Sequence, residues 1–166
     1  SRINHMGIMR QCLLKRMTTT SNDSPATAIR PFDATASGTL LGEGGGLLIL
    51  EEYEHAAKRN AKMYAELVGF GASQDTYKVT EPAPDGRSYG NAVAKALKDA
   101  NLPPAAVDCL VPHGLGIPSH DRAELAGLNL VFGAGLSKVP LAPIKSQVGN
   151  LAAGSAVDAA AAVLAL

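Results

Sequence analysis

The sequence predicts an α/β fold in which short apolar strands alternate with amphipathic helices. Apolar runs of strand length lie at residues 46–51, 63–72, 107–111 and 139–144. Helical periodicity is found at residues 6–14, 52–60, 87–100, 119–132 and 151–166. Elements that alternate in this way pack as layers, with helices on both faces of a sheet. The chain has 166 residues, 46% of them hydrophobic, which suits one domain or a piece of a larger one.

Turn and cap residues set the expected boundaries of the helices. The proline-rich stretch at residues 80–86 is a loop before the third helix, and Asn101 is a left-handed cap at the end of that helix. Ser119 or Asp121 is expected to cap the fourth helix. The charged residues 51–59 indicate a solvated helix with balancing charge pairs.

Composition excludes several classes of function. Fifteen basic residues balance fifteen acidic ones without a basic block, so neither nucleic acid nor an anionic membrane is expected as a partner. Two distant cysteines, Cys12 and Cys109, fit a reducing compartment and are expected to be small core residues. The chain opens without a signal peptide, and residues 151–166 are too short to span a bilayer and read as a buried core helix. We therefore expect a cytoplasmic protein.

Both ends of the chain lack the usual boundary signals. The last helix ends in an apolar run without a cap, which predicts that the natural chain continues. The first helix begins abruptly, so a preceding segment is expected there too, or residues 1–5 derive from cloning.

Polar residues follow two of the predicted strands, where ligands gather in α/β folds. His113 follows the third strand, and Lys145 and Asn150 follow the fourth. Residue types alone leave two interpretations open, a functional site or a structural role. A lone histidine at a strand end is more often structural, and a lysine is by default a surface cation.

A series of motifs then points to one family. It comprises Arg30-Pro31-Phe32-Asp33, Gly42-Glu43-Gly44-Gly45-Gly46, residues 50–56, Tyr64 to Gly71, the Thr80 to Gly86 loop, Ala96 to Ala100, His113-Gly114, and Ile144-Lys145-Ser146 with Gly149. In this order and spacing the chain resembles the elongating β-ketoacyl-acyl-carrier-protein synthases. The resemblance covers nearly the whole sequence.

The resemblance implies a thiolase-like fold, a mixed sheet with helices packed on both faces, of which this chain holds an incomplete second half. Residues 1–36 would be the end of the first half or its connection, and residues 37–166 the C-terminal half-domain, truncated before its last strands. The family's nucleophilic cysteine, which lies at a helix N-terminus in the first half, has no matching segment here.

The family's site residues are transferred only where positions match. His113 matches the histidine that assists decarboxylation, Lys145 the site lysine, and Asn150 stands in the place of the second histidine. Leu115 and Ile117 replace two threonines that hold the carrier's pantetheine arm, and Thr80 is expected at the entrance. The glycines at residues 42–46 lack a nucleotide-binding pattern and indicate close backbone packing under the site, and no metal site is expected.

Two functions from different classes follow from the resemblance. The first is a condensing acyltransferase of fatty acid or polyketide synthesis, inactive as an isolated chain, that joins an acyl thioester to malonyl-carrier protein. The second is a non-catalytic partner that dimerises with an active ketosynthase, because residues 119–124 and 131–133 resemble chain-length-factor subunits. Either implies acyl carrier protein as a partner, a homodimer or heterodimer, and no cofactor beyond carrier-bound phosphopantetheine.

Overall fold

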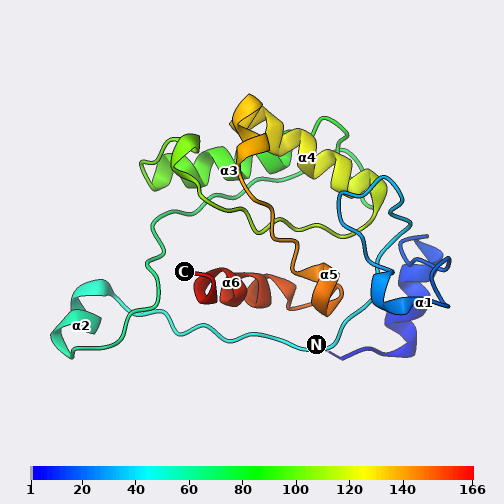
Figure 1. Ribbon diagram of the computed structural model, residues 1–166, viewed down its shortest axis with the longest axis horizontal. Helices are drawn as coiled ribbons and strands as arrows, with labels where there is room; N and C mark the ends of the chain where they lie inside the picture. The colour runs from blue at the N-terminus through cyan, green and yellow to red at the C-terminus, as the bar shows by residue number, and fades with distance from the viewer. Residues whose placement is uncertain (1) are drawn as a thin grey trace.

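The computed structural model describes residues 2–166, and helices joined by long extended segments make up the molecule (Figure 1). The helices are α1 (His5–Leu13), α2 (Tyr53–Lys58), α3 (Arg87–Asp99), α4 (Pro118–Phe132), α5 (Lys145–Val148) and α6 (Gly154–Leu164). Three 3-10 helices lie between them, η1 (Pro25–Thr27), η2 (Pro104–Ala106) and η3 (Gly133–Lys138). None of the helices in residues 2–166 is long and apolar enough to cross a membrane.

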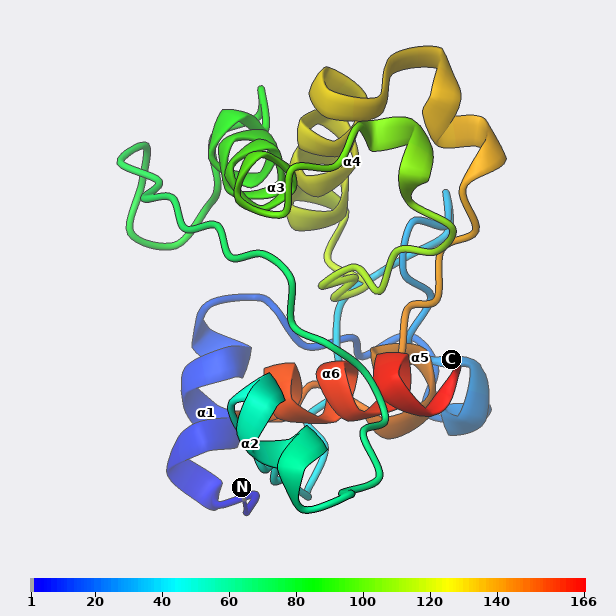
Figure 2. The same ribbon diagram turned by 90° about the vertical axis from the view of Figure 1, so that its left-hand side faces the viewer.

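Helices α3 and α4 lie side by side and form one layer, and α5 and α6 lie in a second (Figures 1 and 2). Glycine allows α3 and α4 to approach closely, because a Cβ at Gly127 would lie 2.4 Å from the carbonyl oxygen of Gly86. The hydrophobic core lies at the C-terminal end of α4. It consists of Leu128, Phe132 and Leu136, with Val93, Val107, Leu110, Val131 and Val139 packed against them.

The predicted mixed sheet is not confirmed. Within residues 2–166 pairing is limited to three isolated parallel bridges, Met17 with Thr39, Leu41 with Asn150, and Leu110 with Leu141. Residues 107–111 and 139–144 therefore meet at one point. Residues 46–51 and 63–72 are extended but unpaired, and the predicted burial of the first is wrong. A strand exists only where a second backbone accepts and donates its hydrogen bonds, and these two segments have none beside them.

The glycine-rich stretch packs as predicted, against the second layer. A Cβ at Gly42 would lie 2.1 Å from the carbonyl oxygen of Val148, and one at Gly46 would lie 2.8 Å from that of Ala156 in α6. Real Cβ atoms do not approach other heavy atoms this closely. Close backbone contact accounts for these glycines.

The helix boundaries are mostly those predicted, but two caps differ. Asn101 has the predicted left-handed conformation, with φ of 55°. Helix α1 does have a cap, since the Oδ1 atom of Asn4 accepts from the N–H of Gly7 at 2.7 Å. Helix α4 begins at Pro118 without a side-chain cap, so the predicted cap at Ser119 or Asp121 is wrong. The carboxylate of Asp121 instead accepts hydrogen bonds from the backbone N–H groups of Phe32, Leu115 and Gly116.

The prediction that Cys12 and Cys109 are small core residues is wrong. Both cysteines are exposed, because no segment of the described chain covers them. Helix α6 is mostly half-buried, with only Gly154 fully buried among its residues. The solvated α2 region is confirmed, since Arg59 and His55 both pair with Glu51.

We predict that Gly86→Ala destabilises the α3–α4 layer. Gly86 has φ of 65°, and a Cβ there would lie 2.1 Å from the carbonyl oxygen of Ala123. Backbone strain and overpacking together should cost at least about 2 kcal/mol of unfolding free energy, measured by urea denaturation. The control is Gly135→Ala, where nothing lies within 4 Å of the added methyl group. Equal stabilities of the two variants would contradict the prediction.

Candidate active site

His113 lies at the end of the extended segment, residues 107–113, that precedes α4. Its backbone N–H donates to Oε1 of Glu124 at 2.6 Å, and the N–H of Gly114 donates to Oε2 at 2.9 Å. The position of His113 is thus set by a carboxylate on α4, and neighbouring atoms surround much of its imidazole although part of the residue reaches solvent.

A second carboxylate, one turn earlier on α4, fixes the residues that follow. Oδ1 of Asp121 accepts from the N–H of Leu115 at 2.9 Å, and Oδ2 accepts from Gly116 at 3.1 Å and from Phe32 at 2.9 Å. We call Asp121 and Glu124 the carboxylate clamp. The five amides partly balance burial, which on its own raises the pKa of both carboxyl groups.

Lys145 is the first residue of α5 and is only 1% exposed. Its Nζ donates to Oδ2 of Asp158 in α6 at 2.6 Å. The lysine stem lies beside the first residue of that helix, because a Cβ at Gly154 would lie 3.5 Å from its Cε. Oδ1 of Asp158 is buried and accepts no hydrogen bond from the described part of the chain. The ammonium group is therefore a buried charge held by one ion pair.

Lys145 and Asp158 both act on the imidazole of His113. Loss of solvent around the imidazole lowers the pKa of His113, and the positive charge of Lys145 lowers it further, whereas Asp158 opposes the shift. The first two effects favour the neutral form of the His113 imidazole. A neutral imidazole beside a fixed positive charge can donate a hydrogen bond to an oxygen that gains negative charge.

Asn150 lies just beyond α5, half-buried, and is held through its backbone. Its N–H donates to the carbonyl of Leu40 at 2.8 Å, and its own carbonyl accepts from the N–H of Gly42 at 3.0 Å. These bonds join the α5 region to the glycine-rich segment. They bring Asn150 into the same layer as Lys145.

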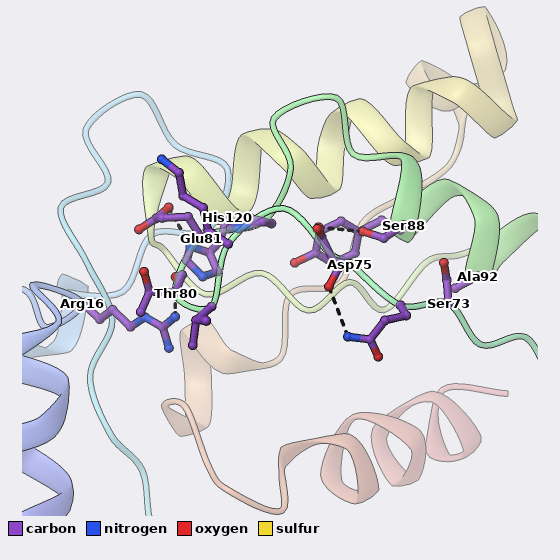
Figure 3. Close-up of a pocket in the computed structure, with 13 residues that line it drawn as sticks. Arg16, Ser73, Asp75, Thr80, Glu81, Ser88, Ala92 and His120 are labelled. Carbon is purple, nitrogen blue, oxygen red and sulfur yellow. Dashed lines mark hydrogen bonds and ion pairs between the residues drawn. The ribbon is translucent and has the colours of Figure 1, made fainter.

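Of the other predicted residues, Leu115 and Ile117 follow His113 closely in the chain, whereas Thr80 lies elsewhere. Leu115 and Ile117 are buried, 6% and 7% exposed, within the turn that the clamp holds. Thr80 lines an open hollow of about 430 Å³ whose lining also includes Arg16 and His120 (Figure 3). His113, Lys145 and Asn150 are not among the residues that line it.

Arg16 and Asp75 hold the loop that forms this hollow. A guanidinium N–H of Arg16 donates to the carbonyl of Thr80, and Asp75 accepts from the N–H of Ala83 at 2.9 Å and from the hydroxyl of Ser88 at 3.0 Å. The loop at residues 73–83 is thereby tied both to α3 and to the segment after α1.

Sequence reasoning missed the supporting carboxylates. The apolar stretch at residues 151–166 contains one charge, Asp158, and a charge in such a stretch needs a partner. Asp121 is predicted only as a possible helix cap, and Glu124 has no predicted role in the site. Their i, i+3 spacing on a helix that directly follows the His113 turn was the available signal. Residues 2–166 contain no group of three His, Cys, Asp or Glu side chains arranged to hold a metal ion.

We predict that Glu124→Gln loosens the His113 turn. A glutamine presents one oxygen and one NH₂ group, so one of the two backbone amides would face another donor. The loss of a buried, charge-assisted hydrogen bond should cost about 2 kcal/mol of unfolding free energy. Hydrogen exchange at the amides of His113 and Gly114 should accelerate. Glu66→Gln, at an exposed position, is the matched control, and unchanged exchange in Glu124→Gln would refute the role of the clamp.

Known proteins are similar to this chain in both sequence and backbone structure. The 3-oxoacyl-[acyl-carrier-protein] synthase 2 of Vibrio harveyi is 45% identical over 150 residues, which is 89% of this chain and 36% of the relative. A solved type II polyketide ketosynthase, described in complex with its acyl-carrier protein and bound to the hexaketide, matches with a TM-score of 0.94 and 31% identity. This match covers 99% of the chain and 40% of the solved one.

A second solved structure, the ishigamide ketosynthase/chain length factor, matches with a TM-score of 0.88 and 30% identity, over 99% of this chain and 38% of the other. The chain spans about two fifths or less of the length of these proteins. The family model for the β-ketoacyl synthase N-terminal domain matches residues 4–56, and that for the C-terminal domain matches residues 64–166. With the second match covering more than half of its residues, this chain belongs to the β-ketoacyl synthase family.

Proposed function

We propose that this chain supplies the histidine and lysine side of a condensing site that joins an acyl thioester to a malonyl thioester. The observation that carries the proposal is the buried ion pair between Lys145 and Asp158 within electrostatic reach of His113. Because desolvation offsets much of the attraction in a buried charge pair, stability alone is a weak reason for this pair, and a functional role is the better explanation.

The chemistry assigned to His113 is stabilisation of the decarboxylated donor. When the malonyl thioester loses CO₂, the electron pair of the broken C–C bond moves onto the thioester, and its oxygen becomes negative. A neutral imidazole N–H donates to that oxygen. The carbanion then attacks the acyl carbonyl, and the thiolate of a cysteine leaves. We place that cysteine in the part of the protein outside this chain.

Lys145 and Asn150 support this chemistry in different ways. The Lys145 ammonium lowers the pKa of His113 and so favours the neutral imidazole, which keeps one N–H to donate to the oxygen. Asn150 can donate an amide hydrogen bond to the same oxygen, but it cannot exchange a proton near neutral pH. It would assist as an oxyanion donor only.

Partners and substrates follow from the same proposal. Because the solved polyketide ketosynthase is described in complex with its acyl-carrier protein, we propose such a carrier for both thioesters here, without a separate cofactor beyond its phosphopantetheine. The arm would pass Leu115, Ile117 and Thr80. We also propose a dimer with a second ketosynthase subunit and a cytoplasmic location. A purely non-catalytic role is not favoured, since the Vibrio harveyi relative is named a synthase.

The proposal predicts that His113→Ala in the full-length protein slows decarboxylation of malonyl-carrier protein by roughly 100-fold or more. Acyl transfer from acyl-carrier protein onto the protein, followed by intact-mass spectrometry, should persist because the nucleophile is another residue. His55→Ala, on the exposed α2, is the control and should decarboxylate at the parent rate. If no covalent acyl adduct forms in the parent protein, a catalytic role is excluded and a structural partner remains.

A second prediction concerns the pKa of His113. Since the Lys145 charge lowers that pKa, Lys145→Met should raise it, and Asp158→Asn should lower it. The measurement is an NMR titration of the imidazole signals. His120 serves as an internal control, because burial and Arg16, not Lys145, lower its pKa. A His113 titration that is the same in all three proteins would show that the ion pair does not act on the imidazole.

A further inference from the structure

The tip of the loop at residues 73–83, Thr80 and Glu81, is held by side chains from two other parts of the chain. A guanidinium N–H of Arg16, which follows α1, donates to the carbonyl of Thr80. In the first turn of α4, Nδ1 of His120 lies 3.9 Å from Oε2 of Glu81. The four residues lie together at one end of the hollow (Figure 3). Both members of each contact belong to this chain.

The base of the same loop is fixed separately. Asp75 accepts from the backbone N–H groups of Tyr77 and Ala83, both at 2.9 Å, and from the hydroxyl of Ser88 in α3 at 3.0 Å. These donors lower the pKa of Asp75, so its carboxylate stays charged in mild acid. A movement of the tip therefore leaves the base attached to α3.

His120 occupies a place where a positive charge is costly. Its side chain is only 12% exposed, so a charged imidazole would lose most of its hydration. Nδ1 lies 3.3 Å from the hydroxyl oxygen of Ser119. The carboxylate of Glu81 is beyond hydrogen-bond distance, and its side chain is 40% exposed, so water screens its attraction for the ring.

Arg16 adds a fixed charge of the same sign. Its Nε is buried and has no hydrogen-bond partner within residues 2–166, and its contact with the tip is to a neutral carbonyl. Burial first, and then the Arg16 charge, lower the pKa of His120, whereas Glu81 and Asp121 oppose the shift with smaller effects. The other titratable side chains nearby are Asp75, Lys78 and Tyr89, which line the hollow, and His113, whose pKa His120 lowers.

We propose that Arg16 and His120 form an acid-sensitive latch on the tip of the 73–83 loop. The latch is closed while His120 is neutral. A proton taken up by the imidazole places two positive charges against the tip, one of them poorly hydrated, and the tip moves away from α4 so that water reaches the ring. The inference rests on contacts inside this chain and not on the condensing chemistry.

The direction of the pH dependence follows from the two positions of the tip. The closed tip lowers the pKa of His120 below its ordinary value of about 6.5, and a hydrated imidazole in the open state returns toward that value. Closure therefore releases a proton. The closed state is favoured at neutral pH and loses stability as the pH falls through about 6.5 toward the pKa of the closed state.

The test is hydrogen exchange with mass spectrometry on the full-length protein at about pH 7.5 and about pH 5.5, corrected for the intrinsic pH dependence of exchange. Protection of the peptide that contains residues 76–83 should fall by roughly threefold or more at the lower pH. Equal protection at both pH values would overturn the proposal. Greater protection in acid would overturn it too, because the attraction between His120 and Glu81 would then prevail.

Variants identify the group that titrates. His120→Gln is neutral at every pH and should give equal protection at both pH values. Glu81→Gln removes an attraction that opposes opening, so its loss of protection in acid should exceed that of the parent. His55→Gln, on the exposed α2, is the matched control and should keep the parent loss.

Circular dichroism of each variant checks that the helices remain. The parent loss of protection in His120→Gln would overturn the proposal, because another group would then be responsible. An unchanged loss in Glu81→Gln would overturn it as well. None of these outcomes depends on decarboxylation or acyl transfer.

Discussion

The carboxylate clamp is the constraint on which the site depends. Asp121 and Glu124 are both largely buried, yet neither forms an ion pair with a lysine or arginine; their charge is met by backbone amides. Four of those amides are consecutive, so the clamp dictates the course of the chain from His113 to Gly116. Because the clamp is on α4 and α4 packs closely on α3 through Gly86, the position of the histidine follows from the packing of one helix pair.

The second layer contributes charge to the site, and the clamp contributes position. The Lys145–Asp158 pair joins α5 to α6, and its two members shift the pKa of His113 in opposite directions, with the lysine having the larger effect. A buried pair of this kind is not a reliable source of stability, because desolvation offsets much of the attraction. Its more direct consequence is electrostatic, since it fixes a positive charge that lowers the pKa of the His113 imidazole.

Local patterns predicted the helices well, because a helix satisfies its backbone internally and its signals lie within a few residues. The loop at residues 80–86, the cap at Asn101 and the end of α4 at Phe132 are examples. The motifs around His113 and Lys145 also identified the family. The clamp and Asp158 are harder to assign, since most of their partners lie 5 to 13 residues away and Phe32 lies 89 residues from Asp121. Such pairings depend on tertiary packing that periodicity does not encode.

The strand predictions differ from the structure for a related physical reason. An apolar run such as residues 46–51 predicts burial only because most sequences contain the partner strands that bury it. Here the run is extended, rests on α6 through Gly46, and leaves Leu47 and Ile49 in solvent. The sequence pattern thus describes the environment of a complete ketosynthase fold. The clamp and the ion pair, by contrast, have both partners within this chain, so the geometry around His113 and Lys145 can form without the remaining strands.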